Sequence, residues 1–598
     1  MTADTAFPSA LAELADACGV ATSYVDAHGA HHDVSERTLR AVLAAMGVVT
    51  DQHKQSHDDD DDDRAVSDHR ALEEFRLRSW RRVLPATVVA EEAVAAEFSV
   101  HVPRGATVSV WAHLEESDTP LPLHPRTSRS PREQCAEIDG VLVDRISFGL
   151  PKSLPIGWHR IVSIVDQVSE QGPTTSASNG GQHPAPQQIE STLVVYPSRI
   201  PLPADLDERR AVGLATQLYQ IRSEQSWGMG DLADLAELVD WAGRDLAADF
   251  VLVNPMHAAE PFPPVSPSPY LPTSRLFAAP LYLRPERIPE YGALSSTEKA
   301  RVDELAASAS AMNSADSIDR DASWAGKLEA LRIMFDSPMS PRRAEQFDRF
   351  LTTHGENLST FAIWCSIAGV HGSDTSQWPA ALSNPESDAV ADHARAYSNE
   401  VLFHQWLQWT VAQQRADAQA SARDAGMRLG IIHDLAVGVH PTGADAWVFN
   451  TSLARGVSVG APPDIYNQRG QDWSQPPLRP DALAEGGYRQ FRDIVRAALR
   501  DAGGIRIDHI LGLFRLWWIP SGSLPTEGTY VHYDHEAMLG VLALEATRAG
   551  AVVIGEDLGT VAPGVREELA ARGILGTSVM WFEQDASGPI DPQEYRRL

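Results

Sequence analysis

The sequence predicts a multidomain chain whose largest part is an α/β barrel, preceded by a helical region and a small β-sandwich. Three observations support this fold class. The 598 residues are too many for a single hydrophobic core. Residues 84–198 contain short runs rich in β-branched and aromatic residues, separated by turn residues. From residue 199 onward, continuous apolar runs alternate with helical patterns, which indicates a parallel sheet buried on both faces.

Residues 1–80 form the predicted helical region, which includes an acidic linker. Leu39, Val42 and Leu43 repeat at helical spacing, and Ser35 stands where the N-cap of this helix is expected. The stretch 51–68 contains consecutive aspartates from Asp58 to Asp63. Because like charges at this density repel one another, we expect a solvated linker there.

The region 84–198 is predicted to be the β-sandwich domain. Its expected strands are 98–102, 108–112, 141–146, 158–165 and 191–196.

Residues 199–598 form the predicted barrel, with a helical insertion at about 284–427. Six strands are expected, at 213–219, 250–256, 428–433, 504–507, 551–554 and 577–582. A closed (β/α)8 barrel of the TIM type needs eight strands. We therefore expect a barrel that is truncated after about six strands, with its C-terminal part missing.

Charge and cysteine usage exclude several classes of partner. With 50 basic and 81 acidic residues the net charge is −31, which argues against nucleic acids and anionic membranes. The three cysteines, Cys18, Cys135 and Cys365, lie far apart, so neither disulfides nor a zinc cluster are expected. No motif requires a cofactor or a metal ion. The N-terminal residues lack the pattern of a signal peptide, and we expect a soluble, cytoplasmic protein.

Two strands of the predicted barrel end in carboxylates. Asp508 follows the run Gly504–Ile507, and Glu556 follows the run Val552–Gly555. Two carboxylates at the C-terminal ends of neighbouring strands are the minimal equipment for cleaving a glycosidic bond. Taken alone, Asp508 could belong to a structural ion pair and Glu556 could cap a helix. Their occurrence on successive strands favours the chemical interpretation.

Two further residues accompany this pair. Arg506 lies two residues before Asp508, on the same face of the strand, where its guanidinium would keep that carboxylate ionised. Asp434 ends the preceding strand in the same way and could orient either Arg506 or a substrate hydroxyl. The alternative for Asp434 is an ordinary hydrogen-bonded loop carboxylate.

Residues from about 212 to 598 resemble the 4-α-glucanotransferases of the α-amylase superfamily, which are also called amylomaltases or disproportionating enzymes. The resemblance rests on four segments in this order: Ile221–Asp231, Gly460–Asp464 together with Gln471–Trp473, Arg506–His509, and Gly555–Gly559. The helical and sandwich regions also resemble the N-terminal extensions of longer bacterial members.

The resemblance implies roles for individual residues. Asp508 matches the nucleophile and Glu556 the acid/base of a retaining double displacement on α-1,4-glucans and maltooligosaccharides. The remaining matches are expected to bind substrate: Asp434, Arg506, Tyr270, Asp464, Gln471, Trp473 and His509.

One feature of the family is missing. Its members carry a third acid, in a His-Asp pair on strand seven, and nothing between Glu556 and Leu598 supplies it. We therefore expect that the 598 residues are part of a longer protein and are poorly active or insoluble alone. Two alternatives to glucan transfer stay open, an α-glucan hydrolase and an inactive glucan-binding protein.

Overall fold

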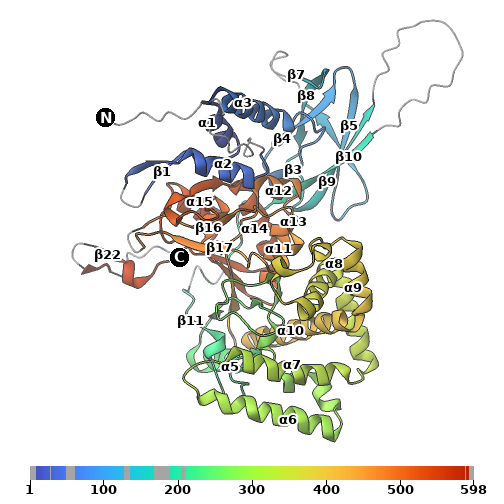
Figure 1. Ribbon diagram of the computed structural model, residues 1–598, viewed down its shortest axis with the longest axis vertical. Helices are drawn as coiled ribbons and strands as arrows, with labels where there is room; N and C mark the ends of the chain where they lie inside the picture. Colours follow the sequence, from blue (N-terminus) through green and yellow to red (C-terminus); the bar gives the residue numbers. More distant parts are fainter. Residues whose placement is uncertain are drawn as a thin grey trace, which may run out of the picture.

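A computed structural model describes residues 9–26, 29–48, 61–126, 135–166, 187–203, 206, 209–464, 467–585 and 588–591. The molecule is elongated (Figure 1). The N-terminal helices and the sandwich lie at one end, a group of long helices lies at the other, and the parallel sheet lies between them.

The N-terminal region contains three helices and one small hairpin. Their bounds are α1 (Ser9–Ala17), β1 (Ser23–Val25), β2 (His31–Asp33), α2 (Glu36–Ala45) and α3 (Asp61–Arg78). As expected, Ser35 caps α2 by accepting a hydrogen bond from the N–H of Thr38 at 3.1 Å. The buried residues Leu39, Val42 and Leu43 then face the core.

The acidic linker expected at 51–68 is wrong for its second half, because α3 begins at Asp61. Residues 51–60 lie outside the described residues. Asp68 is fully buried and receives two hydrogen bonds of 2.8 Å from the guanidinium of Arg40. Leu72, one turn further along, is also buried. Tertiary pairing and burial therefore outweigh the charge repulsion that favoured an extended chain.

The β-sandwich contains the five predicted strands, as β4, β5, β8, β9 and β10, together with β3, β6 and β7, which were not predicted. Its strand order is β3-β10-β9-β5-β6-β8-β4, with β7 paired to β8, and all pairs except β3 with β10 are antiparallel. The bounds are β3 (Thr87–Glu91), β4 (Ala96–Pro103), β5 (Thr107–His113), β6 (Leu121–Pro125), β7 (Cys135–Ile138), β8 (Val141–Leu150), β9 (Gly157–Asp166) and β10 (Gln187–Tyr196). Alternate inward-facing residues such as Val100, Phe148 and Ile161 make its core.

The parallel sheet has five strands in the order β11-β12-β15-β18-β21. They are β11 (Gly213–Thr216), β12 (Phe250–Val253), β15 (Gly430–Leu435), β18 (Gly504–Ile507) and β21 (Val552–Gly555). The helices between them include α5 (Leu232–Leu246), α13 (Arg489–Leu499) and α14 (His535–Ala549), and α15 (Val565–Ala571) follows β21.

The strand expected at 577–582 does not form. Only Leu575 bridges to the sheet, through Ile554, and residues 580–582 make a 3-10 turn instead. Among the described residues, Met580, Trp581 and Phe582 are 60%, 73% and 51% exposed, so this apolar run is not buried against the sheet.

The segment between β12 and β15 is a large helical insertion, drawn in green and yellow in Figure 1. It comprises the short strands β13 (His257–Ala258) and β14 (Ser274–Ala278) and the helices α6 (Ser296–Ser310), α7 (Arg320–Asp336), α8 (Pro341–His371), α9 (Asp388–Ala396) and α10 (Ser398–Asp424). Helix α10 packs against both α5 and α8, which ties the insertion to a helix that connects two strands of the parallel sheet.

A second sheet was not predicted from the sequence. Its order is β17-β16-β19-β20, all antiparallel, and its strands are β16 (Val457–Ala461), β17 (Gln471–Gln475), β19 (Arg515–Pro520) and β20 (Thr529–His532). The short helices α11 (Ala444–Val448) and α12 (Pro480–Glu485) lie beside it in the sequence.

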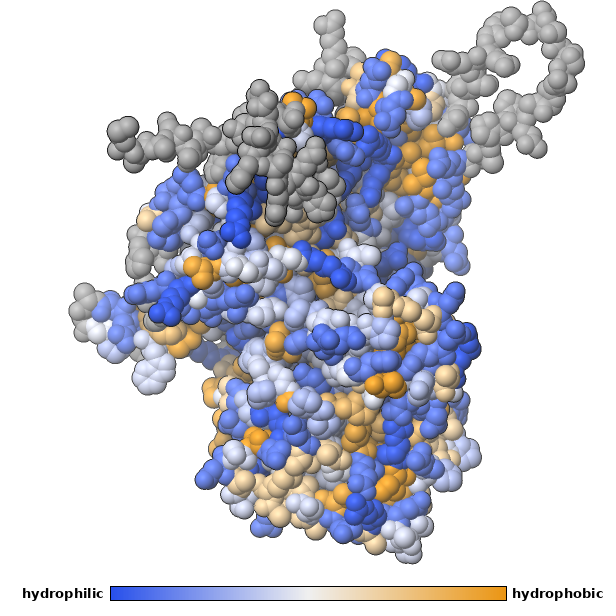
Figure 2. Space-filling view, viewed as in Figure 1, coloured by the Kyte–Doolittle hydropathy of each residue, from blue (hydrophilic) through white to orange (hydrophobic). Residues whose placement is uncertain are grey.

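The visible surface is predominantly polar, with apolar residues scattered among polar ones (Figure 2). Among the helices of the described residues, we find none that combines the length and the apolar character needed to traverse a bilayer.

Candidate active site

The C-terminal edge of the parallel sheet brings three carboxylates together. Asp434 lies at the end of β15, Asp508 directly follows β18, and Glu556 directly follows β21. The register pairs Asp434 with Arg506 and Ile507 with Gly555. Because the strands are parallel, their C-terminal ends meet at one edge, which is where α/β barrels bind and transform ligands.

Arg506 connects two of these carboxylates. Its Nη1 lies 2.6 Å from Oδ1 of Asp434, and its Nη2 lies 2.9 Å from Oδ1 of Asp508. The exposed fractions of the side chains of Arg506, Asp434 and Asp508 are 19%, 4% and 26%. Although burial opposes its charge, the two carboxylates raise the pKa of Arg506. A permanently charged guanidinium therefore fixes the orientation of Asp508.

Asp434 accepts a second hydrogen bond, from the hydroxyl of Tyr270 at 2.9 Å. Burial raises the pKa of Asp434 to about 6, against the opposing effects of Arg506 and of this hydroxyl. Burial, followed by the charge of Asp434, raises the pKa of Tyr270. Tyr270 is therefore a neutral donor, and it connects the segment before β14 to the end of β15.

Glu556 is held by two backbone groups. The N–H of His509 donates to Oε2 and the N–H of Leu558 donates to Oε1, each at 3.0 Å. Burial raises the pKa of Glu556, the hydrogen bond from Leu558 opposes this effect, and the charge of Asp508 adds to it. A carboxyl whose pKa lies above the ordinary value holds its proton longer as pH rises, which suits a proton donor.

His509 and Trp473 adjoin the carboxylates. Trp473 meets the His509 ring edge to face, with 5.2 Å between ring centroids, and its Nε1 donates to Oε1 of Gln471 at 3.2 Å. Burial lowers the pKa of His509 to about 4, so its ring is neutral. Asp464 lies in the connection between β16 and β17, where its Oδ1 accepts from the N–H of Asn467 at 2.5 Å.

Two polar residues at this edge were missed by the sequence analysis. Tyr270, Asp434 and Arg506 line a cavity of about 180 Å³ together with Gln217 and Asn254. Asn254 directly follows β12, and its buried Oδ1 accepts from the N–H of Leu218 at 2.8 Å. Gln217 and Asn254 lie inside the strands expected at 213–219 and 250–256, which end at Thr216 and Val253 in the structure. With the correct strand ends, the signal that identified Asp508 and Glu556, a polar residue directly after a parallel strand, finds both.

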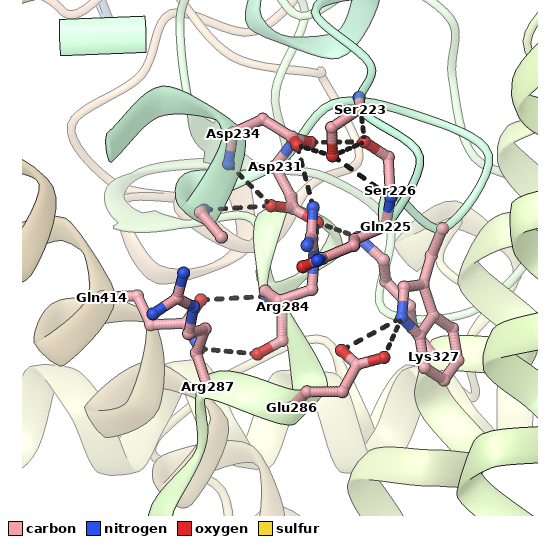
Figure 3. A network of polar contacts seen from close by, with 12 residues as sticks. Ser223, Gln225, Ser226, Asp231, Asp234, Arg284, Glu286, Arg287, Lys327 and Gln414 are labelled. Atoms are coloured by element: carbon pink, nitrogen blue, oxygen red, sulfur yellow. Dashed lines mark hydrogen bonds and ion pairs between the residues drawn. The ribbon is translucent and has the colours of Figure 1, made fainter. Parts of the chain in front are cut away.

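The segment Ile221–Asp231, in contrast, is anchored in a buried polar network (Figure 3). Arg284 binds Oδ2 of Asp231 at 2.6 Å and Oδ1 of Asp234 at 2.9 Å, and Asp231 also caps α5. Lys327 lies 3.9 Å from Asp231, and burial lowers the pKa of Lys327 to about 8. These groups face one another inside the fold, so they hold the connection between β11 and α5 in place.

Within the described part of the chain, no three His, Cys, Asp or Glu side chains are grouped so as to hold a metal ion. All three cysteines are free, and Cys18 and Cys365 are buried.

Two carboxylates at the ends of neighbouring parallel strands are the groups that α/β enzymes acting on glycosidic bonds use. A family model described as 4-alpha-glucanotransferase matches residues 216–598. A second model, described as MalQ N-terminal beta sandwich domain, matches residues 83–197. The chain belongs to the 4-alpha-glucanotransferase family.

Individual relatives agree with this assignment. A 4-alpha-glucanotransferase of Mycobacterium tuberculosis is 47% identical, and the match covers 99% of this chain and 78% of that protein. The crystal structure of amylomaltase from Corynebacterium glutamicum superposes with a TM-score of 0.85 at 42% identity, over 98% of this chain and 77% of that one. An amylomaltase from Streptococcus agalactiae in complex with acarbose shares the fold, with a TM-score of 0.55 at 19% identity over 64% of this chain and 75% of that one.

Proposed function

We propose that this protein is a 4-α-glucanotransferase that moves segments of α-1,4-glucan to an acceptor glucan or glucose by a retaining double displacement. One observation carries the proposal: Arg506 orients Asp508, and the residue after Asp508 binds Glu556. A fixed carboxylate beside a carboxyl of raised pKa is the arrangement that this mechanism requires.

In the first step, Glu556 gives its proton to the glycosidic oxygen while an oxygen of Asp508 attacks C1 of the sugar. The C1–O bond breaks, the shortened glucan leaves with a new hydroxyl, and a β-linked glucosyl ester of Asp508 remains. In the second step, Glu556 takes the proton of the acceptor's 4-hydroxyl, whose oxygen attacks C1. The ester bond breaks, and both side chains return to their starting states.

The other predicted residues have supporting roles in this proposal. Arg506 orients Asp508, while Asp434 and Tyr270 fix Arg506 and face the cavity beside it. Trp473 offers an apolar ring face for a sugar, and Gln471, Asp464 and His509 belong to the walls of the glucan cleft. Transfer in place of hydrolysis then depends on acceptor contacts that exclude water.

We also propose that the five parallel strands belong to a barrel of the (β/α)8 type. Their spatial order follows the sequence without reversal, whereas a doubly wound sheet reverses its order at a switch point. A reducing, cytoplasmic location is proposed as well, because free thiols such as the exposed Cys135 are typical of such compartments.

Incubation with maltotriose tests the proposed activity. A transferase yields glucose together with glucans longer than maltotriose, whereas a hydrolase yields shorter products only. Asp508→Asn is expected to lower the rate of transfer by about a thousandfold or more. Transfer at an unchanged rate in this variant would remove Asp508 as the nucleophile, and the absence of any turnover in the unsubstituted protein would favour a glucan-binding function.

A further inference from the structure

The N-terminal region extends the second sheet at its outer edge. The N–H of His532 donates to the carbonyl of Gly19, and the N–H of Ala21 donates to the carbonyl of Tyr530, both at 2.8 Å. Val20 and Val531 form an antiparallel bridge between these bonds. Residues 19–21 therefore act as an additional edge strand beside β20.

The same region covers both faces of this sheet. On one face, α2 packs against β16 and β19, and its Thr38 donates to the carbonyl of Glu527 at 2.9 Å. On the other face, the ring of Tyr24 meets Trp517 edge to face, with 4.8 Å between centroids, and Tyr530 at 6.5 Å. Both faces of this small sheet are thus buried by residues that lie hundreds of positions earlier in the chain.

The opposite edge of the sheet, β17, reaches the active site at two points. Trp473 contacts the ring of His509, the neighbour of Asp508. Gln475 donates from Nε2 to the carbonyl of Tyr270 at 2.9 Å, and the hydroxyl of Tyr270 binds Asp434. The strands between the two edges are hydrogen-bonded throughout, since Gly460 pairs with both Asp472 and Trp517.

We propose that residues 19–26 and 29–45 are a positioning element of the glucan cleft, in which Tyr24 and Thr38 hold the second sheet so that Trp473 and Tyr270 face the bound sugar. This inference rests on the proposed function. It assigns the N-terminal region a part in substrate binding, because sheets transmit displacements across their paired strands. The direct hydrogen bonds to Asp508 and Glu556 come from Arg506 and from the backbone N–H groups of His509 and Leu558, which lie outside the second sheet.

Because the second sheet and the parallel sheet carry different residues of the site, the proposal predicts a specific change in the steady-state kinetics. Loosening the second sheet raises the KM for maltotriose, since Trp473 and Tyr270 lose their fixed positions. The value of kcat and the pH profile stay close to those of the unsubstituted protein, because the groups that react keep their places. A merely global loss of stability would instead lower the active fraction, and hence kcat, at unchanged KM.

Tyr24→Ala is the first test, with initial rates measured over a range of maltotriose concentrations. The expected KM rises by about three- to tenfold, the range set by one aromatic pair, and kcat changes less than twofold. Tyr24→Phe keeps the ring and should restore the KM. Val25→Ala is the matched control, because Val25 is the next residue on β1 and is 53% exposed.

Thr38→Val provides a second, milder variant, which removes the hydroxyl that binds the carbonyl of Glu527 and the hydroxyl of Ser35. A smaller rise in KM in the same direction would support the proposal. An unchanged KM in both Tyr24→Ala and Thr38→Val, with normal far-UV circular dichroism, would overturn it. That outcome would leave the proposed function intact, since transfer would continue, whereas the proposed function fails only if Asp508→Asn stays active or no transfer occurs.

Discussion

The backbone N–H of His509 donates to Oε2 of Glu556 at 3.0 Å. This bond joins the residue after the proposed nucleophile to the proposed acid/base across neighbouring strands. His509 makes it from a left-handed backbone conformation, with φ 48° and ψ 60°. The turn after β18 therefore sets the positions of both reacting side chains.

The left-handed conformation makes the choice of residue at 509 testable. A β-branched side chain is strained there by about 1–2 kcal/mol, whereas asparagine tolerates it. His509→Val should therefore lower kcat more than His509→Asn, although both remove the imidazole. Steady-state rates on maltotriose measure the difference. Equal kcat values in the two variants would show that backbone strain at this turn does not affect the reaction.

Glu556→Gln removes the proposed proton donor while keeping its size. We expect kcat with maltotriose to fall by about 10²- to 10⁴-fold, the usual contribution of general acid–base catalysis. With α-glucosyl fluoride as donor, formation of the glucosyl ester should recover, because fluoride leaves without protonation. Release of fluoride, followed with an ion-selective electrode, checks this result. If Glu556→Gln were equally impaired with maltotriose and with α-glucosyl fluoride, Glu556 would not be the proton donor.

Arg506→Lys tests the bridge between the two aspartates. Lysine keeps the charge but lacks the planar fork that reaches Asp434 and Asp508 together. We expect at least about a tenfold fall in kcat/KM with the fold retained. Arg506→Ala, which leaves two carboxylates facing each other, should cost about 3–5 kcal/mol in the free energy of unfolding as well. Near-normal kcat/KM in Arg506→Lys would mean that a positive charge is sufficient to orient Asp508, without the planar shape of the guanidinium.

The raised pKa of Asp434 makes a prediction about pH. Its value of about 6 in the folded protein exceeds the ordinary value of 3.8, chiefly through burial. The folded state thus binds this proton more tightly than the unfolded chain does. The associated stabilisation, about 3 kcal/mol, is fully present below about pH 4 and is lost as pH rises through 6.

Denaturant unfolding of Asp434→Asn between pH 4 and 7 measures this contribution. The variant should lose stability less steeply than the unsubstituted protein as pH rises. Asp240→Asn, which changes an exposed carboxyl on α5, serves as the control and should follow the unsubstituted protein. The rate of transfer should instead increase as pH rises through about 6, because Asp434 is then ionised and pairs with Arg506. A parallel pH dependence in Asp434→Asn and the unsubstituted protein would refute this account.

The buried network in Figure 3 predicts a loss of stability at a distance from the reacting groups. Arg284→Ala leaves Asp231 and Asp234 buried without their partner and should cost about 3–5 kcal/mol. Arg287→Ala, three residues away and exposed, should cost less than about 0.5 kcal/mol. Urea titration of both variants gives the comparison. Similar urea midpoints for Arg284→Ala and Arg287→Ala would show that the buried network contributes little to the free energy of unfolding.

The features that could be predicted are those with a local signal. Runs of apolar residues identified β15, β18 and β21, and the polar residue at the end of each run placed Asp434, Asp508 and Glu556 at one edge of the sheet. Alternating patterns identified the sandwich strands in the same way. The roles assigned to the site residues stay predictions, which the variants above are designed to test.

The features that were missed depend on partners distant in the sequence. The first half of helix α3 was expected to be part of a linker because of its acidic residues, but Asp68 is buried against Arg40. The run 577–582 resembles a strand, but its side chains Met580, Trp581 and Phe582 are more than half exposed and are not buried against the sheet. The second sheet escaped prediction because its four short strands come from two separate segments, and its covering residues come from the N-terminal region.

The sequence by itself determined the β-sandwich, the succession of parallel strands, the family and the identity of the strand-end carboxylates, because each of these depends on residue type and on spacing along the chain. Only the tertiary structure decided that Arg506 bridges Asp434 and Asp508, that His509 binds Glu556, and that Tyr24 supports the sheet carrying Trp473. These relationships are distances between residues that the chain separates. Packing of the whole fold sets such distances, and no local pattern encodes them.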